Sequence, residues 1–236
     1  MKLNSIIFLL GVLLASLFSS CNPQGGRSEN RFAGQAYTVE SFDKISLTGG
    51  YDVEIKQTDE PGLVIKASEA DYSKIDVWVE NDVLYVNNKF KNITTDEIRL
   101  EISITKLSKI DIKGGVFLKT LGYVELDTLD MAVEGGANIK MYIKANQINV
   151  KTQGGVNVDL EGVAHEFSAS TEGAGNIDAD NLEAEIVTCK VAGIGNASIY
   201  ATGELNAKIE GVGRISYRGN PNINKQINGI GIVHRK

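Results

Sequence analysis

The sequence predicts an all-β protein: a right-handed parallel β-helix, or β-solenoid, of about 18–21 residues per coil, with an N-terminal strand-rich cap. Two observations predict this fold. Paired glycines recur at a nearly constant step, and apolar residues alternate with polar ones on both sides of each pair. Self-similarity at this period is typical of stacked units that bury their apolar faces against their neighbours. Connections between parallel strands of one sheet are almost always right-handed.

The first 20 residues have the plan of a lipoprotein signal peptide. One basic residue, Lys2, precedes an apolar run that is too short for a membrane-spanning helix. Small residues then lead to Cys21, which is the expected site of lipidation and anchors the chain to a membrane. The alternative is cleavage elsewhere in the leader, which would leave Cys21 to form a disulfide with Cys189.

Residues 21–35 are polar and rich in glycine, which predicts a flexible tether between the anchor and the folded part. The formal net charge of the chain is -6, and no cluster of Lys or Arg stands out. Nucleic acid is therefore not an expected partner, because its binding depends on a basic surface.

Residues 36–105 are predicted to form an N-terminal β region that covers one end of the repeats. The segment "KISLTGGYDVEI" already has a glycine pair, at Gly49, between alternating apolar residues. About sixty residues of different pattern follow it, with several strand-like runs and a predicted hairpin turn at Asn81 and Asp82. An uncovered parallel edge would invite association, which favours a capping role for this region.

Residues 106–236 are predicted to be β-helix repeats. Each repeat begins its turn at the first glycine of a pair, where glycine reaches positive φ without a Cβ penalty. Together with Gly49, these corner glycines are Gly114, Gly135, Gly154, Gly173, Gly193 and Gly211, and a weaker copy begins at Gly229. Before and after each corner, inward apolar residues alternate with outward polar ones, as Leu129, Met131 and Val133 do.

Four asparagines fall three residues after a corner glycine: Asn138, Asn157, Asn176 and Asn196. In consecutive coils they would lie above one another at the inter-strand spacing of about 4.7–4.9 Å. At that distance each amide can donate a hydrogen bond to the next one. The pattern therefore predicts a structural asparagine ladder rather than a ligand site.

The order of these segments resembles one family. The leader, "FDKISLTGGYDVEIKQ", "VENDVLYV", and the units "GAGNIDA", "GIGNASI" and "GVGRISY" are similar to the putative auto-transporter adhesin, head GIN domain family, over roughly residues 36–218. The resemblance implies a bacterial cell-envelope protein with a β-helical fold and an adhesin-like role. It brings no catalytic residues.

The search for catalytic or metal chemistry gives one weak candidate. Asp159 and Asp178 occupy equivalent places in adjacent repeats, where two carboxylates could serve acid/base chemistry or bind Ca²⁺. Lys140 occupies the same column and offers an ion-pair partner for Asp159 instead. His165 and His234 lack metal-ligand spacing, so we expect no metal site and no cofactor.

The function expected from the sequence is that of a non-enzymatic envelope lipoprotein, exported and anchored to the outer membrane. Its repeat face would bind a glycan or a protein surface, because the outward positions carry many polar residues and few aromatic ones. We assign no site to Tyr142, Tyr200 or Tyr217, the last of which points inward by parity. Two alternatives stay open: a carbohydrate-active enzyme on the same scaffold, and a structural or assembly role.

Overall fold

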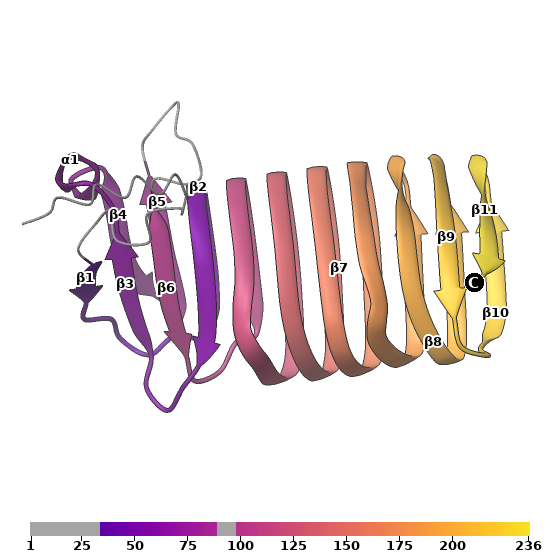
Figure 1. The fold of residues 1–236 in the computed structure, drawn as a ribbon, viewed down its shortest axis with the longest axis horizontal. Coiled ribbons are helices and arrows are strands. Elements are labelled where there is room, and N and C mark those ends of the chain that lie inside the picture. Colours follow the sequence, from indigo (N-terminus) through magenta and orange to yellow (C-terminus); the bar gives the residue numbers. More distant parts are fainter. Residues whose placement is uncertain (1–33, 89–97) are drawn as a thin grey trace, which may run out of the picture. The chain divides into compact units, whose positions relative to one another are not determined.

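A computed structural model describes residues 34–88 and 98–236, and this part of the chain is all-β apart from one helical turn, α1 (Glu69–Tyr72). The strands form one mixed sheet (Figure 1). In chain order they are β1 (Gly34–Tyr37), β2 (Lys44–Gln57), β3 (Gly62–Lys66), β4 (Ile75–Glu80), β5 (Val83–Asn88), β6 (Arg99–Ile104), β7 (Lys109–Val191), β8 (Ile194–Ile209), β9 (Val212–Arg218), β10 (Asn222–Ile227) and β11 (Ile230–Arg235). The prediction of an all-β protein is confirmed, whereas Cys21 and the predicted leader (1–20) lie outside the described residues, as does most of the tether.

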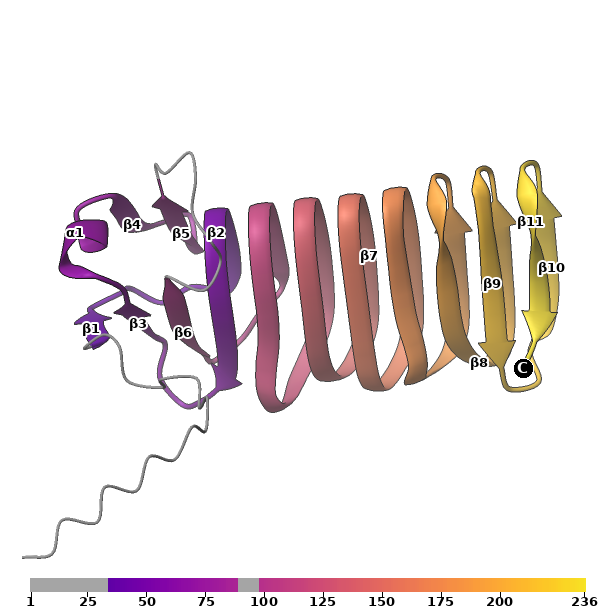
Figure 2. The same cartoon turned by 45° about the horizontal axis from the view of Figure 1, so that its top comes forward.

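Successive repeats pair in parallel and in the same phase. The corner Gly49 of β2 lies opposite Gly114 of β7, and the segments that begin at Ile194, Val212 and Ile230 lie opposite one another in turn. Strand β7 is 83 residues long because its ladder continues through its glycine pairs. It turns back on itself several times in Figures 1 and 2, so that its own segments lie side by side.

The core lies between these segments and follows the predicted period of two. In β2, for example, Ile45, Leu47, Val53 and Ile55 are buried while their neighbours are at least partly exposed. The residues of the buried core run from Phe42 to Val233, within the compact unit Phe32–Lys236. A polypeptide of residues 22–236 therefore contains the whole described core.

The N-terminal strands pair differently. Strands β5 and β6 both lie parallel to β2, β5 along its first half and β6 along its second half. Beyond them the pairing becomes antiparallel, since β3 pairs with β6, β1 with β3, and β4 with β5. The β4–β5 connection has Asn81 and Asp82 at φ values of 52° and 62°, which is the hairpin turn that the sequence predicts.

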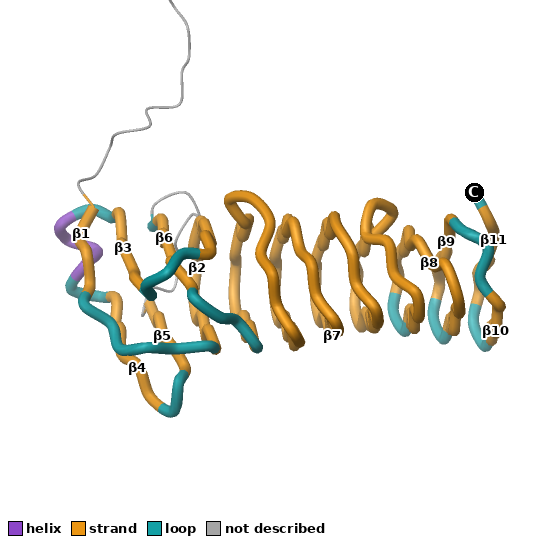
Figure 3. The backbone as a smooth tube through the Cα atoms, turned by 90° about the horizontal axis from the view of Figure 1, so that it is seen from below, coloured by secondary structure: helices purple, strands orange, loops and turns teal. Residues whose placement is uncertain are grey.

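Short loops interrupt the strands of the later repeats, as the teal segments of Figure 3 show. The chain bends at Gly193, Gly211 and Gly229, whereas the earlier corners at Gly135, Gly154 and Gly173 stay within β7. The repeats therefore share one register but not one corner geometry.

Candidate functional site

The corner glycines lie against one another in successive repeats. A Cβ atom added at Gly135 would overlap the carbonyl oxygen of Gly114, and a Cβ added at Gly154 would overlap that of Gly135. Positive φ occurs at five of the predicted corners: Gly49, Gly114, Gly135, Gly154 and Gly173.

The expectation of positive φ is wrong for the two remaining corners, Gly193 and Gly211. There the close approach of the preceding repeat excludes a side chain, since a Cβ would overlap the carbonyl oxygens of Gly173 and Gly193 respectively. Glycine is needed at these two positions for space rather than for its backbone conformation.

Three of the four predicted ladder asparagines are joined by hydrogen bonds. The Nδ2 of Asn176 donates to the Oδ1 of Asn157 at 3.0 Å, and the Nδ2 of Asn196 donates to the Oδ1 of Asn176 at 3.1 Å. Among the described residues no hydrogen bond joins Asn138 to this chain of amides. A second pair, Asn224 and Asn206, repeats the arrangement on β10 and β8 at 3.3 Å.

The two aspartates considered for acid/base chemistry have different hydrogen-bond partners. The Nζ of Lys140 lies 3.0 Å from Asp159 and 2.7 Å from Glu161, and these hydrogen bonds raise the pKa of the lysine. Asp178 instead accepts a hydrogen bond from the backbone N–H of Asp180 at 3.1 Å. Within the described residues no group of three or more His, Cys, Asp or Glu residues is placed to hold a metal ion.

A surface that the sequence did not reveal surrounds Tyr123 and Tyr142. The two rings meet edge to face with centroids 5.8 Å apart, and the Tyr123 side chain is 53% exposed. Lys140 lies 5.3 Å from the Tyr142 ring, and Lys144 lies 5.4 Å from the Tyr123 ring. We call these four residues, with the carboxylates that pair with their lysines, the tyrosine surface: Tyr123, Tyr142, Lys140, Lys144, Glu125, Asp159 and Glu161.

A glycine two repeats further along the chain makes room for one of the rings. Gly162 has a φ of +134°, and a Cβ added there would lie 3.2 Å from Cε1 of Tyr123 and would overlap the carbonyl oxygen of Ile143. The Tyr123 ring thus reaches across the intervening repeat to Gly162. Sequence reasoning missed this contact because it followed only the paired glycines, although the lone Gly122, Gly162 and Gly219 were visible as a second, weaker series.

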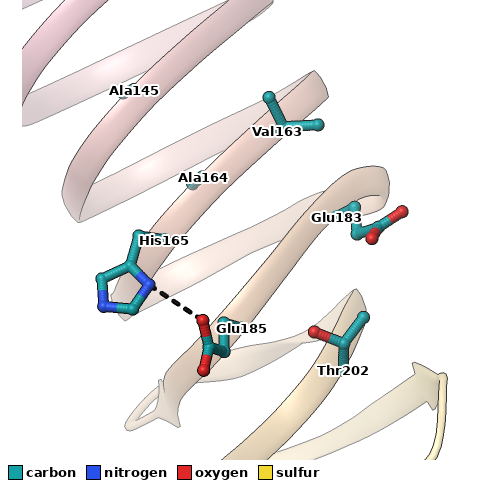
Figure 4. A pocket seen from close by; sticks show the side chains of 7 residues that line it. All are labelled: Ala145, Val163, Ala164, His165, Glu183, Glu185 and Thr202. Atoms are coloured by element: carbon teal, nitrogen blue, oxygen red, sulfur yellow. Dashed lines mark hydrogen bonds and ion pairs between the residues drawn. The ribbon is translucent and has the colours of Figure 1, made fainter.

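A cavity of about 380 Å³ adjoins this surface. It forms where the repeats differ in length, since the β7–β8 register shifts between Ala179 and Glu183 and again between Ala184 and Ile186. Figure 4 shows its lining, in which His165 points toward Glu185 while Glu183 and Thr202 lie on the other side. The lining residues are Ala145, Val163, Ala164, His165, Glu183, Glu185 and Thr202.

Two polar groups in the lining of this cavity pair with each other, and a third bonds to the backbone. The Nδ1 of His165 lies 3.1 Å from Glu185, and both side chains are well exposed to solvent. The Thr202 hydroxyl donates to the carbonyl oxygen of Ala184 at 3.2 Å. A histidine–carboxylate pair can move a proton, and the lining also holds Thr202 and a second carboxylate, Glu183, but no Ser, Cys or Lys.

The remaining candidate residues have structural surroundings. Cys189 is fully buried, and burial raises the pKa of its thiol to about 12. Tyr217 points into the core as its parity predicts, and Tyr200 lies under Arg218, whose guanidinium carbon is 4.6 Å from the ring centroid.

These features define an all-β protein whose described residues carry exposed columns of side chains and an open cavity. Across residues 34–88 and 98–236, no helix is long and apolar enough to cross a membrane. The chain belongs to the putative auto-transporter adhesin, head GIN domain family, whose sequence model matches residues 41–221. The family resemblance noted in the sequence is thereby confirmed.

Solved structures of bacterial proteins have the same fold. A putative adhesin from Bacteroides fragilis is 25% identical, with a TM-score of 0.83, over 88% of this chain and 98% of its own. A putative lipid binding protein from Parabacteroides distasonis is 20% identical (TM-score 0.69; 88% and 98% covered). A putative adhesin from Parabacteroides merdae is 22% identical (TM-score 0.66; 88% and 97% covered). A comparison with curated proteins finds no significant match.

Proposed function

We propose that this chain is a non-enzymatic cell-envelope lipoprotein that binds a glycan polymer through the tyrosine surface. Membership of a family named for adhesins supports a role in binding at the cell envelope. The leader and Cys21 support export and lipid anchoring to the outer membrane.

The proposal includes a right-handed β-solenoid with an N-terminal cap as the architecture. The in-phase parallel pairing of repeats, with partners 18 residues apart along β8, β9 and β11, supports a β-solenoid. The strong general preference for right-handed crossovers supports that hand. The antiparallel strands β1, β3 and β4 support a capping role for the region that we assign to residues 36–105, with the repeats in 106–236.

The observation that carries the proposed function is the pair formed by the exposed Tyr123 and the half-buried Tyr142 among paired lysines and carboxylates. An aromatic ring offers an apolar face and a polar hydroxyl, which suits a sugar ring with its C–H face and its hydroxyl groups. Lys140 and Lys144 and their carboxylate partners supply donors and acceptors around the rings. A glycan polymer could contact several repeats at once, and these individually weak contacts would together raise its affinity.

The test is a binding screen of envelope and host glycans on the polypeptide 22–236. We expect saturable binding of one glycan class, weakened about tenfold by Tyr123→Ala, because one aromatic contact of this kind is worth roughly 1 kcal/mol or more. Tyr200→Ala is the matched control, since it removes a ring on another repeat that is already covered by Arg218. Equal binding by both variants would overturn the assignment to the tyrosine surface.

The same binding screen distinguishes the two alternatives, an enzyme and a structural protein. The His165–Glu185 pair in the cavity is the feature that favours a carbohydrate-active enzyme, so each bound polymer is also assayed for cleavage. Cleavage that is lost in His165→Ala would replace our proposal with the enzymatic one. No glycan binding, together with co-purification of an envelope complex from cells, would favour the structural role.

Lipid anchoring is tested separately in cells. Labelling with radioactive palmitate should mark the full chain and should be abolished by Cys21→Ser. A labelled Cys21→Ser chain, or an unlabelled wild type, would exclude acylation at this cysteine.

A further inference from the structure

The glycine motif changes along the repeats. In the repeats that begin at Gly114, Gly135 and Gly154, two glycines precede an apolar residue, as in Gly-Gly-Val. In those that begin at Gly173, Gly193, Gly211 and Gly229 the apolar residue stands between the glycines, as in Gly-Ile-Gly. Because side chains alternate along a strand, this shift by one position moves the apolar side chain to the other face.

The structure shows the consequence of this shift. In the early repeats the apolar residue is buried: Val116 is 1% exposed and Val156 is 2% exposed. In the later repeats it faces solvent, with exposed fractions of 66% for Ile194, 47% for Val212 and 74% for Ile230.

These side chains contribute little to the core. The inward position beside them is now a glycine, and a Cβ at Gly195 or Gly213 would overlap the carbonyl oxygen of the preceding repeat. A polar residue at the outward position would leave the buried core unchanged. A row of exposed aliphatic residues on adjacent strands is typical of an interaction surface.

The exposed residues form a continuous column. Ile194 lies opposite Val212, and Val212 lies opposite Ile230, so neighbouring side chains are about one strand spacing apart. Ile232 is also exposed and lies opposite Arg214 on the adjacent outward column. We call Ile194, Val212, Ile230 and Ile232 the aliphatic ladder.

Three of the four ladder residues, Val212, Ile230 and Ile232, lie in the basic part of the chain. Residues 211–236 contain Arg214, Arg218, Lys225, Arg235 and Lys236 but no Asp or Glu, although acidic residues outnumber basic ones in the whole chain by 30 to 24. The carboxylate just before this segment, Glu210, is paired with Lys190 and Lys208 at 2.6 Å each. Lys236 pairs with Asp180 at 3.0 Å, which leaves Arg214, Arg218, Lys225 and Arg235 as the cations that give this segment a charge opposite to that of the chain as a whole.

We propose that the aliphatic ladder and the cations beside it bind the surface of an anionic phospholipid bilayer. Projecting aliphatic side chains can enter the boundary between headgroups and acyl chains, while Arg and Lys pair with the phosphates. The ladder residues do not line the cavity described above. This surface is distinct from the tyrosine surface and does not depend on glycan binding.

The experiment uses the polypeptide 22–236, which lacks the leader and Cys21, so that no acyl chain contributes. Co-sedimentation is measured with vesicles of phosphatidylcholine alone and with vesicles containing phosphatidylglycerol. We expect binding only to the anionic vesicles, with an affinity that falls as salt is raised. The double variant Ile194→Ser/Ile230→Ser should bind at least about tenfold more weakly, because each replaced side chain removes several buried CH₂ or CH₃ groups.

Phe117→Ser is the matched control, since it removes an exposed apolar side chain from an early repeat, and it should bind like the wild type. Circular dichroism checks that each variant is folded. Absence of binding to anionic vesicles, or equal binding by the double variant, would overturn the proposal. The proposal would also be overturned if the wild-type chain failed to bind vesicles and instead self-associated through this ladder. Sedimentation velocity would then detect a dimer for the wild type and not for the double variant.

Discussion

Gly135 and Gly136 are adjacent in one repeat, yet replacing each with alanine should have opposite effects on stability. Gly135 has a φ of +122°, and a Cβ there would overlap the carbonyl oxygen of Gly114. A Cβ added at Gly136 would meet no atom of another part of the chain within 4 Å, and the φ of Gly136 is not positive. The two changes add the same methyl group, so the difference between them isolates the corner geometry.

The expected magnitude follows from the two contributions. A non-glycine residue in that backbone region costs about 1–3 kcal/mol. Moving a paired carbonyl to relieve the overlap adds a cost similar to overpacking, about 1–3 kcal/mol. We expect Gly135→Ala to lower the free energy of unfolding by about 3–5 kcal/mol. Gly136→Ala should instead raise it by about 0.5–1 kcal/mol, because alanine restricts the unfolded chain more than glycine does.

The assay is equilibrium unfolding of the polypeptide 22–236 in urea, followed by circular dichroism, with the slope compared between variants. An unchanged slope would show that the same cooperative unit unfolds in each case. Equal midpoints for Gly135→Ala and Gly136→Ala would refute the argument that glycine is needed where successive repeats touch.

Three further predictions concern single side chains. Asn176→Ala should destabilise the fold by about 1 kcal/mol because it removes two amide hydrogen bonds, whereas Asn138→Ala should change stability by less than about 0.5 kcal/mol; urea midpoints would check both. Lys190 and Lys208 lower the pKa of Glu210 to about 2, so the contribution of Glu210 to the free energy of unfolding is complete above about pH 4.5 and is lost as pH falls toward 2. The stability difference between wild type and Glu210→Gln should therefore shrink across that window. A constant difference would contradict this prediction. Cys189 should not react with a thiol reagent at pH 8 until urea unfolds the chain, and rapid labelling of the folded protein would show that its strand opens readily.

The inward half of this fold could be predicted from the sequence, whereas the outward half could be predicted only where one residue type or an opposite charge recurs in register, as in the asparagine ladder and the Lys140–Asp159 pair. Burial constrains every second residue, so Leu129, Met131 and Val133 identify their own face. The corner glycines and the order of the asparagines follow from the same register. Outward residues carry no such constraint, which is why Tyr123 was not recognised as part of a surface until its ring was placed against Tyr142 and Gly162.

The cavity could not be predicted for a different reason. It depends on the register shifts near Glu183, which arise because one repeat has residues that its neighbour lacks. The pairing of β5 and β6 along the two halves of β2 also depends on long-range register. The spacing of the paired glycines gives the length of each repeat but not the position of the extra residues within it, so it cannot predict these register shifts.

The two proposed binding surfaces occupy separate outward columns, and their independence can be tested. The alternation of side chains lets one column change without altering the core or the other column. The basic residues after Glu210 would contact an anionic bilayer. The earlier repeats, which carry the tyrosine surface, are more acidic, so the same bilayer would repel them. Ile194→Ser/Ile230→Ser should therefore retain glycan binding, and Tyr123→Ala should retain vesicle binding. Loss of both activities in either variant would mean that the two surfaces are one site, or that the variant is misfolded, and a denaturation curve would separate these outcomes.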